Sequence, residues 1–145
     1  MSLFIASDHG GLELKKFIIS QLSDIHFIDL GTNTDDSVHY PNYADKLCIE
    51  TLKSTENQGI LICGTGIGIS IRANRFKGIR AALVYDEFSS KMAKEHNNAN
   101  VLCLGGRTTS KLDALTFIRT WLSTEFEGGR HQIRLDMLDA PTPRK

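Results

Sequence analysis

Cys63 and the glycines that follow it form the stretch of this sequence best suited to chemistry. The segment from Cys63 to Gly68 reads Cys-Gly-Thr-Gly-Ile-Gly. Alternating glycines allow backbone N–H groups to converge on an anion at the start of a helix. A thiol in such a place can ionise more readily and serve as a base or a nucleophile. The alternative is a buried cysteine above a tight turn, and the residue types alone favour neither.

The residues in and after this stretch exclude three common phosphate-binding motifs. A P-loop ends in Gly-Lys followed by Ser or Thr, whereas Ile69 and Ser70 follow the glycines here. A dinucleotide-binding fingerprint has the spacing G-x-G-x-x-G, whereas the spacing here is G-x-G-x-G. A cysteine phosphatase loop would place an arginine six residues after the cysteine, where this chain has Ile69. The remaining interpretation of this stretch is a thiol beside an anion-binding loop.

Asp8 and His9 directly follow an apolar run and precede two glycines. A hydrogen-bond acceptor beside a group that can switch between donor and acceptor suits the hydroxyls of a sugar. The alternative is that Asp8 caps the next helix while His9 is merely exposed.

Further candidates lie in the second half of the chain. His96 begins a polar turn, and the simpler interpretation is a histidine at the end of a surface helix, unless a second chain brings it to the site. Arg130 and Arg134 are spaced i, i+4, so they share one helical face and could clamp a phosphate. A solvated basic turn is the alternative. Arg107, which follows a glycine pair, could join the two arginines.

The elements that must position these residues alternate between short apolar runs and longer amphipathic stretches. This pattern is typical of βαβ units and a parallel sheet, and the continuously apolar runs indicate strands buried on both faces. The expected strands are 3–7, 26–30, 59–63, 80–85 and 100–105. The expected helices are 12–22, 41–52, 69–75, 87–95 and 111–122, with a terminal helix within 129–138. In the first helix, Lys15 and Lys16 are expected to face water.

The direction of the strands places the candidate residues at two opposite edges of the expected sheet. In an open α/β sheet, ligands bind beyond the carboxyl ends of the strands, where the segments after the first, third and fifth strands should lie. The turn at His96 precedes the fifth strand and should lie at the opposite, amino-terminal edge. Within one subunit, Cys63 and His96 should therefore not meet.

Composition narrows the class of protein. The chain has 145 residues, with 17 Lys and Arg against 17 Asp and Glu, and this balance argues against a nucleic-acid binder that relies on phosphate contacts. We expect one globular α/β/α domain over residues 1–139, followed by a flexible tail at 140–145. The three cysteines match neither a zinc site nor a disulfide framework and fit a reducing cytoplasm. No signal peptide or membrane-spanning stretch is expected.

Taken together, five segments resemble the type B ribose-5-phosphate isomerases. They read Ser-Asp-His-Gly-Gly at 7–11, Tyr-Pro-Asn-Tyr-Ala at 40–44, Gly-Ile-Leu-Ile-Cys-Gly-Thr-Gly-Ile-Gly-Ile-Ser at 59–70, His-Asn-Asn-Ala-Asn-Val at 96–101 and Glu-Gly-Gly-Arg-His at 127–131. The resemblance covers essentially the whole chain in order. It implies a Rossmann-like fold, with strands one and three as neighbours. It also implies the interconversion of ribose 5-phosphate and ribulose 5-phosphate through an enediolate, in the non-oxidative pentose phosphate pathway, with no metal or organic cofactor.

The resemblance also implies roles for individual residues. Some relatives have an acid at the position of the catalytic cysteine, whereas this chain keeps Cys63, which would move a proton between C1 and C2 with help from Thr65. His96 would open the furanose ring, and Asp8 and His9 would bind the sugar. The enediolate oxygens would be held by the amides of Gly64, Thr65, Gly66, Ile67 and Gly68. The other implied contacts are Asn97 with the substrate and Arg107, Arg130 and Arg134 with its phosphate.

The family forms homodimers whose sites combine both chains, with the pairing of dimers into tetramers left open. One subunit would supply Cys63, Asp8 and His9, and the other would supply His96 and the arginines. Two other functions stay open. One is an isomerase for a six-carbon sugar phosphate, of galactose or allose, although such relatives often divide their residues between two different chains. The other is a sugar-phosphate sensor without catalytic activity.

Overall fold

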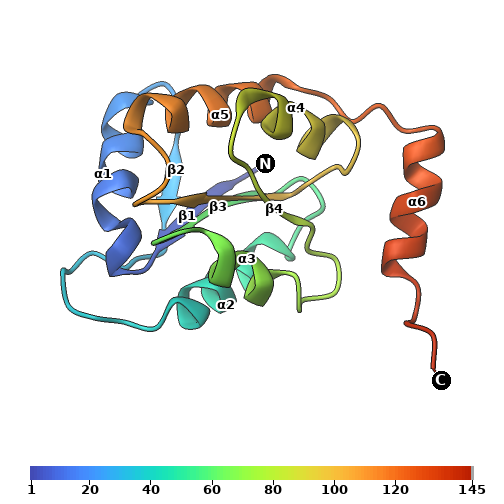
Figure 1. Ribbon diagram of the computed structural model, residues 1–145, viewed down its shortest axis with the longest axis horizontal. Helices are drawn as coiled ribbons and strands as arrows, with labels where there is room; N and C mark the ends of the chain where they lie inside the picture. Colours follow the sequence, from blue (N-terminus) through green and yellow to red (C-terminus); the bar gives the residue numbers. More distant parts are fainter. Residues whose placement is uncertain (145) are drawn as a thin grey trace.

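Five parallel strands form the middle layer of the computed structural model, which describes residues 1–144 (Figure 1). They are β1 (Leu3–Ser7), β2 (Phe27–Asp29), β3 (Gln58–Cys63), β4 (Ala81–Leu83) and β5 (Val101–Gly105). Their order across the sheet is β2-β1-β3-β5-β4, and every neighbouring pair is parallel. The prediction of a parallel sheet in which the first and third strands are neighbours is confirmed.

The strands differ in burial because they differ in their number of neighbours. β1 and β5 are buried along their whole length, and β3 is buried except at its first residue, as their continuous apolar runs predict. The two outer strands, β2 and β4, have three residues each and stay partly exposed. Both are shorter than the runs that predicted them, since an edge strand is paired on one side only.

Helices cover both faces of the sheet (Figure 1). One face carries α1 (Leu12–Gln21), α4 (Glu87–Glu95) and α5 (Lys111–Ser123), and the other carries α2 (Tyr40–Thr51) and α3 (Ile67–Ala73). A short 3-10 turn, η1 (His9–Gly11), precedes α1. A separate hydrophobic cluster fills each interface between helices and sheet, as a three-layer architecture requires.

Two of these helices begin where local chemistry sets their first turn. Pro41 stands at the start of α2, where its missing N–H leaves no intrahelical hydrogen bond unmade. α3 begins at Ile67, two residues before the predicted start, because the left-handed backbone of Gly66 leads straight into the helix. Gly68 is therefore part of α3 rather than of the loop before it.

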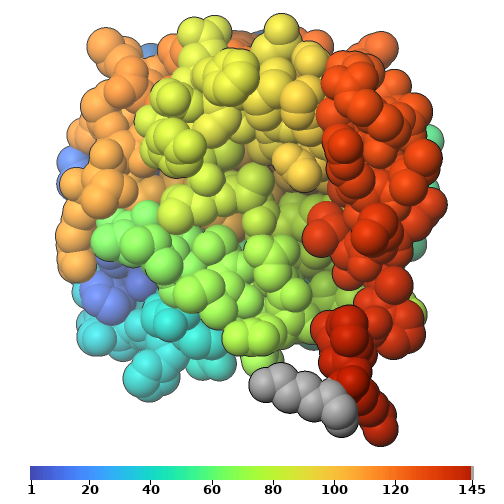
Figure 2. Space-filling model, turned by 45° about the vertical axis from the view of Figure 1, so that its right-hand side comes forward, coloured from blue at the N-terminus to red at the C-terminus, as the bar shows by residue number. Residues whose placement is uncertain are grey.

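The last helix, α6 (Arg130–Asp139), projects beside the amino-terminal edge of the sheet (Figures 1 and 2). Its buried side chains are His131 and Leu135, while Ile133 and Met137 are exposed. Residues 140–144 form no helix or strand, and Lys145 lies outside the described residues, so the flexible tail at 140–145 stays a prediction. None of the helices formed by residues 1–144 has the length and apolar character needed to cross a membrane.

The prediction that Lys15 faces water is wrong. Its side chain is fully buried, and its ammonium donates to a carboxylate oxygen of Asp29 at 2.7 Å and to the amide oxygen of Asn33 at 3.0 Å. It also donates to the backbone carbonyl of Thr32. An ammonium can be buried only when it is paired and hydrogen-bonded, and these three oxygens meet that need. Helical spacing alone could not show this, because the partners come from the last residue of β2 and from the loop that follows it.

Lys15→Met should lower the free energy of unfolding by about 2–3 kcal/mol, because it leaves a carboxylate and a buried carbonyl without their partner. The neighbouring exposed residue provides a matched control, since Lys16→Met should change this free energy by no more than about 0.5 kcal/mol. Urea unfolding followed by circular dichroism measures both. Equal losses in the two variants would contradict the assignment.

Candidate functional site

The loops after β3 and β5 are joined backbone to backbone at the carboxyl-terminal edge of the sheet. The N–H of Gly106 donates to the carbonyl of Cys63 at 2.8 Å, and the N–H of Arg107 donates to the carbonyl of Gly64 at 2.9 Å. The guanidinium of Arg107 also lies against this loop, because a Cβ added at Gly64 would stand 3.0 Å from its Nη1. Arg107 is therefore held beside the glycine loop of its own chain.

The loop after β1 packs against the same two loops. A Cβ added at Gly106 would lie 2.3 Å from the carbonyl oxygen of Gly10, and one added at Gly10 would lie 3.2 Å from the amide nitrogen of Gly64. Side chains at these positions would separate the loops, so glycine is what allows them to touch. Asp8 and His9 are thereby brought to the edge that carries Cys63.

Cys63 is the last residue of β3 and is only 5% exposed. The N–H of Gly66 donates to its sulfur at 3.2 Å, and this hydrogen bond holds the sulfur against the glycine loop. Gly66 has φ +79°, and a Cβ there would lie 2.6 Å from the side chain of Leu83 and 2.9 Å from the carbonyl of Leu104. Both the backbone conformation and the space therefore require glycine at the residue that contacts the thiol.

The other two cysteines are chemically separate from this site. Burial raises the pKa of the Cys48 thiol to about 12. Burial also raises the pKa of the fully buried Cys103 thiol well above its ordinary value. Neither can act as a base near neutral pH. Of the three free thiols, Cys63 is the one that a ligand at the loop would meet.

The loop amides divide into two groups. The N–H of Gly66 is used by the sulfur, and that of Ile67 donates to the hydroxyl oxygen of Thr65 at 3.3 Å. Within residues 1–144, no hydrogen bond from the N–H of Gly64, Thr65 or Gly68 is found. These three donors, beside the thiol, can stabilise negative charge on a ligand oxygen.

Asp8 and His9 are both engaged by the backbone. One carboxylate oxygen of Asp8 accepts from the N–H of Gly11 at 3.1 Å, so the capping alternative describes this residue correctly. Nδ1 of His9 accepts from the N–H of Val38 at 3.1 Å. A neutral His9 ring then carries its proton on Nε2, which makes it a hydrogen-bond donor to a ligand. Local sequence gave no sign of Val38, because it lies 29 residues along the chain.

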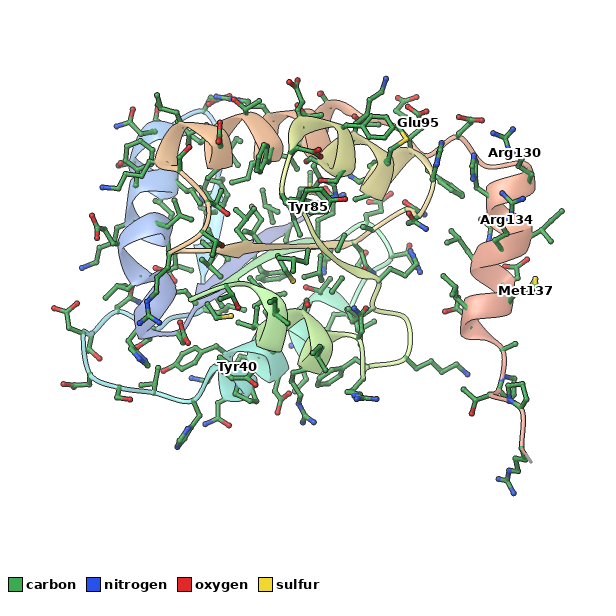
Figure 3. All side chains as sticks on the ribbon, viewed as in Figure 1. Tyr40, Tyr85, Glu95, Arg130, Arg134 and Met137 are labelled. Atoms are coloured by element: carbon green, nitrogen blue, oxygen red, sulfur yellow. The ribbon has the colours of Figure 1, made fainter. Side chains whose placement is uncertain are left out.

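A second cluster lies at the opposite edge of the sheet. His96 and Asn97 follow α4 in the turn that leads into β5, and Arg130 and Arg134 lie on α6 at the same end (Figure 3). One chain therefore does not bring these four residues to Cys63, as the direction of the chain predicts. Arg107 does not lie with these arginines within one chain, because β5 ends at the edge where β3 ends. The assignment of all three arginines to the subunit opposite Cys63 is therefore wrong for Arg107.

His96 also has a neighbour that sequence reasoning missed. Its ring stacks on that of His131, with centroids 4.1 Å apart and planes inclined by 16°. The possible metal-binding atoms of His96, Glu127 and His131 lie within 4.8 Å of one another. An imidazole binds a metal ion along its ring plane, and one ion cannot lie in two nearly parallel stacked planes. The three residues are therefore not arranged as a metal centre.

A cavity is present at each edge of the sheet. Cys63 lines neither of the two described below. A groove of about 620 Å³ runs between the end of α6 and the segment 74–82, and Asn97 contributes to it. A smaller one of about 270 Å³ lies beside Thr65 and Tyr85 at the other edge. Tyr40 at the start of α2 covers the first turn of α3, directly after the glycine loop, since a Cβ added at Gly68 would lie 2.6 Å from its ring. Each edge thus offers an open, incomplete site.

Known proteins resemble this chain over nearly its whole length. Ribose-5-phosphate isomerase B of Escherichia coli (strain K12) is 39% identical over 140 residues, which cover 95% of this chain and 94% of that protein. A structure of Clostridium thermocellum ribose-5-phosphate isomerase B has a TM-score of 0.91 at 45% identity, covering 96% of this chain and 95% of that one. Ribose-5-phosphate isomerase B from Mycoplasma genitalium with bound ribulose-5-phosphate has a TM-score of 0.91 at 42% identity, covering 95% and 93%.

The family assignment rests on agreement between sequence and fold. A family model described as Ribose/Galactose Isomerase matches residues 3–138. The parallel sheet, the cysteine beside a glycine loop and all but the last residue of the terminal helix lie within this matched range. This chain is therefore a member of the ribose/galactose isomerase family.

Proposed function

We propose that this protein interconverts ribose 5-phosphate and ribulose 5-phosphate. The observation that carries the proposal is the thiol of Cys63 beside the unused amides of Gly64, Thr65 and Gly68. An isomerisation through an enediolate needs a base at carbon and donors for the oxygens on which charge develops. Relatives named ribose-5-phosphate isomerase B favour the five-carbon substrate over galactose or allose 6-phosphate and over a sensor without activity.

The reaction on the open-chain sugar begins at C2. The thiolate of Cys63 removes the C2 proton, and the electron pair moves through C1 to the aldehyde oxygen, which gives an enediolate. The amides of Gly64, Thr65 and Gly68 donate to its oxygens, and the hydroxyl of Thr65 assists proton transfer between them. Cys63 then returns the proton to C1, which leaves the ketone at C2. Because the amides are fixed by the loop, they need no reorganisation as the charge appears.

The sugar and its phosphate extend from this centre towards the neighbouring loops. His9 donates from Nε2, and Asp8 accepts from a sugar hydroxyl with the carboxylate oxygen that does not cap η1. Arg107, exposed beside Gly64, offers a guanidinium to the phosphate. The remaining groups that the reaction needs lie at the opposite, amino-terminal edge of the sheet.

A second copy of the chain completes the site. His96 of one subunit donates a proton to the ring oxygen of the furanose bound beside its partner's Cys63 and so opens the ring, while Asn97 contacts the substrate. Arg130 and Arg134 on the same edge bind the phosphate. Two identical sites in a homodimer follow, because each chain has one half-site at each edge.

Exposed apolar side chains support this homodimer. α2 and α3 lie side by side, and both expose large aliphatic side chains: Ile49 in α2, and Ile67 and Ile71 in α3. Leu52, directly after α2, is exposed as well. α6 exposes Ile133, Met137 and Leu138, and Figure 3 shows Met137 pointing away from the rest of the chain. Apolar surface of this kind marks sites of association. Pairing of two dimers into a tetramer stays a prediction.

The wider setting belongs to the same proposal. The reaction is a step of the non-oxidative pentose phosphate pathway, and the resemblance implies that it needs no cofactor. Cys48, Cys63 and Cys103 are free thiols, which supports a reducing compartment such as the cytoplasm. The single domain at residues 1–139 also stays a prediction.

Cys63→Ala should lower the turnover of ribose 5-phosphate by about 100-fold or more, because it removes the base while leaving the amides in place. Binding of ribulose 5-phosphate, measured by calorimetry, should persist. Cys48→Ala is the matched control and should keep the turnover. A wild-type protein that binds sugar phosphates but isomerises none of five or six carbons would contradict the proposal and favour a sensor.

Arg134→Ala should raise the KM for ribose 5-phosphate by about 10-fold to 100-fold and change kcat far less. A group that grips the phosphate does so equally in the ground state and in the transition state, so its loss weakens uniform binding. Steady-state kinetics in both directions measures this. A fall in kcat without a rise in KM would show that the phosphate lies elsewhere.

A further inference from the structure

His131 is a buried residue for which the reaction above has no use. It lies in the first turn of α6, and its side chain is 6% exposed. Its Nε2 has no hydrogen-bond partner among the described residues and stands 3.6 Å from a carboxylate oxygen of Glu127. Burying a ring nitrogen without a partner costs free energy, so packing must hold the ring in place.

The packing partner of His131 is the ring of His96. The two rings are stacked, with centroids 4.1 Å apart and planes inclined by 16°. A carboxylate oxygen of Glu95 lies 3.8 Å from Nε2 of His96. Within residues 1–144, no side-chain hydrogen bond of His96 is found, and its side chain is 36% exposed. The stack is therefore the contact that sets the plane of the His96 ring.

The same contact joins α6 to the body of the protein, together with the packing of the buried Leu135. The segment that leads into this helix is tied to α4 by one hydrogen bond, from the N–H of Glu127 to the carbonyl of Glu95 at 3.0 Å. His131, which follows Arg130 in the first turn of α6, adds a second contact through its stack on His96. The stack thus links His96 to the helix that carries Arg130 and Arg134.

We propose that His131 is a positioning residue that acts through His96, because the stack orients the His96 ring for opening the furanose ring in the partner's site. This inference rests on the proposed function. An imidazole rotated away from the ring oxygen can no longer transfer a proton to it, and small displacements of such groups carry large losses in rate. The stacked face of His131, rather than its ring nitrogens, performs the positioning.

Substitutions of His131 test this role directly. His131→Ala removes the stack and should lower the turnover of ribose 5-phosphate by about 10-fold to 100-fold. His131→Phe keeps an aromatic face without ring nitrogens and should restore turnover to within a few-fold of the wild type. Gln132→Ala, on the exposed side of the same helix turn, is the matched control and should keep the wild-type rate. An inactive His131→Phe beside an active control would overturn the proposal.

A double-mutant cycle separates action through His96 from a general effect on α6. In a His96→Ala background, His131→Ala should cause no further loss of turnover. An equal loss in both backgrounds would overturn the proposal.

Hydrogen exchange isolates the step at Cys63, because the exchange of the C1 hydrogen of ribulose 5-phosphate with D2O requires no ring opening. In His131→Ala, the ratio of this exchange to the isomerisation of ribose 5-phosphate should rise, whereas a disrupted site would lower both rates together.

The same series of variants separates failure of this inference from failure of the proposed function. A wild type without isomerase activity removes that function and this inference with it. A wild type that is active and is slowed by His96→Ala but not by His131→Ala removes the inference alone.

Discussion

The direction of the chain in a parallel sheet is the constraint on which this site depends. Every strand ends at one edge, so the loops that follow β1, β3 and β5 gather there, while the turn that carries His96 stands where β5 begins. The five residues of β5 separate these edges by roughly 16 Å, which no side chain spans. The thiol of Cys63 and the imidazole of His96, which we propose opens the sugar ring, cannot meet within one chain. A second copy of the chain is the simplest way to bring them together.

At the carboxyl-terminal edge of the sheet, glycines position the groups around Cys63. Close backbone contacts at Gly10, Gly64 and Gly106 allow three loops to touch, and the left-handed Gly66 directs its own N–H at the sulfur of Cys63. The amides left over are fixed by the fold before a substrate arrives. The placement of the Cys63 thiol beside amides that could stabilise an anion thus follows from packing that leaves no room for side chains.

Periodicity and chain direction were enough to predict the elements, the parallel sheet and the separation of Cys63 from His96, because these follow from local pattern and strand polarity. Contacts between distant segments were beyond such reasoning. Lys15 is buried because oxygens of Asp29, Thr32 and Asn33 surround it, and a helical pattern contains none of them. Similarly, only the folded chain shows that His131 stacks on His96.

The central claim is that each active site takes Cys63 from one chain and His96 from another. It is tested most directly by mixing Cys63→Ala and His96→Ala variants, each nearly inactive, and allowing their subunits to exchange. Half of the dimers would then be mixed, each with one intact site, so activity should recover to about a quarter of the wild-type value. Mixed dimers that form, as shown by differently tagged subunits, yet recover no activity would contradict the account.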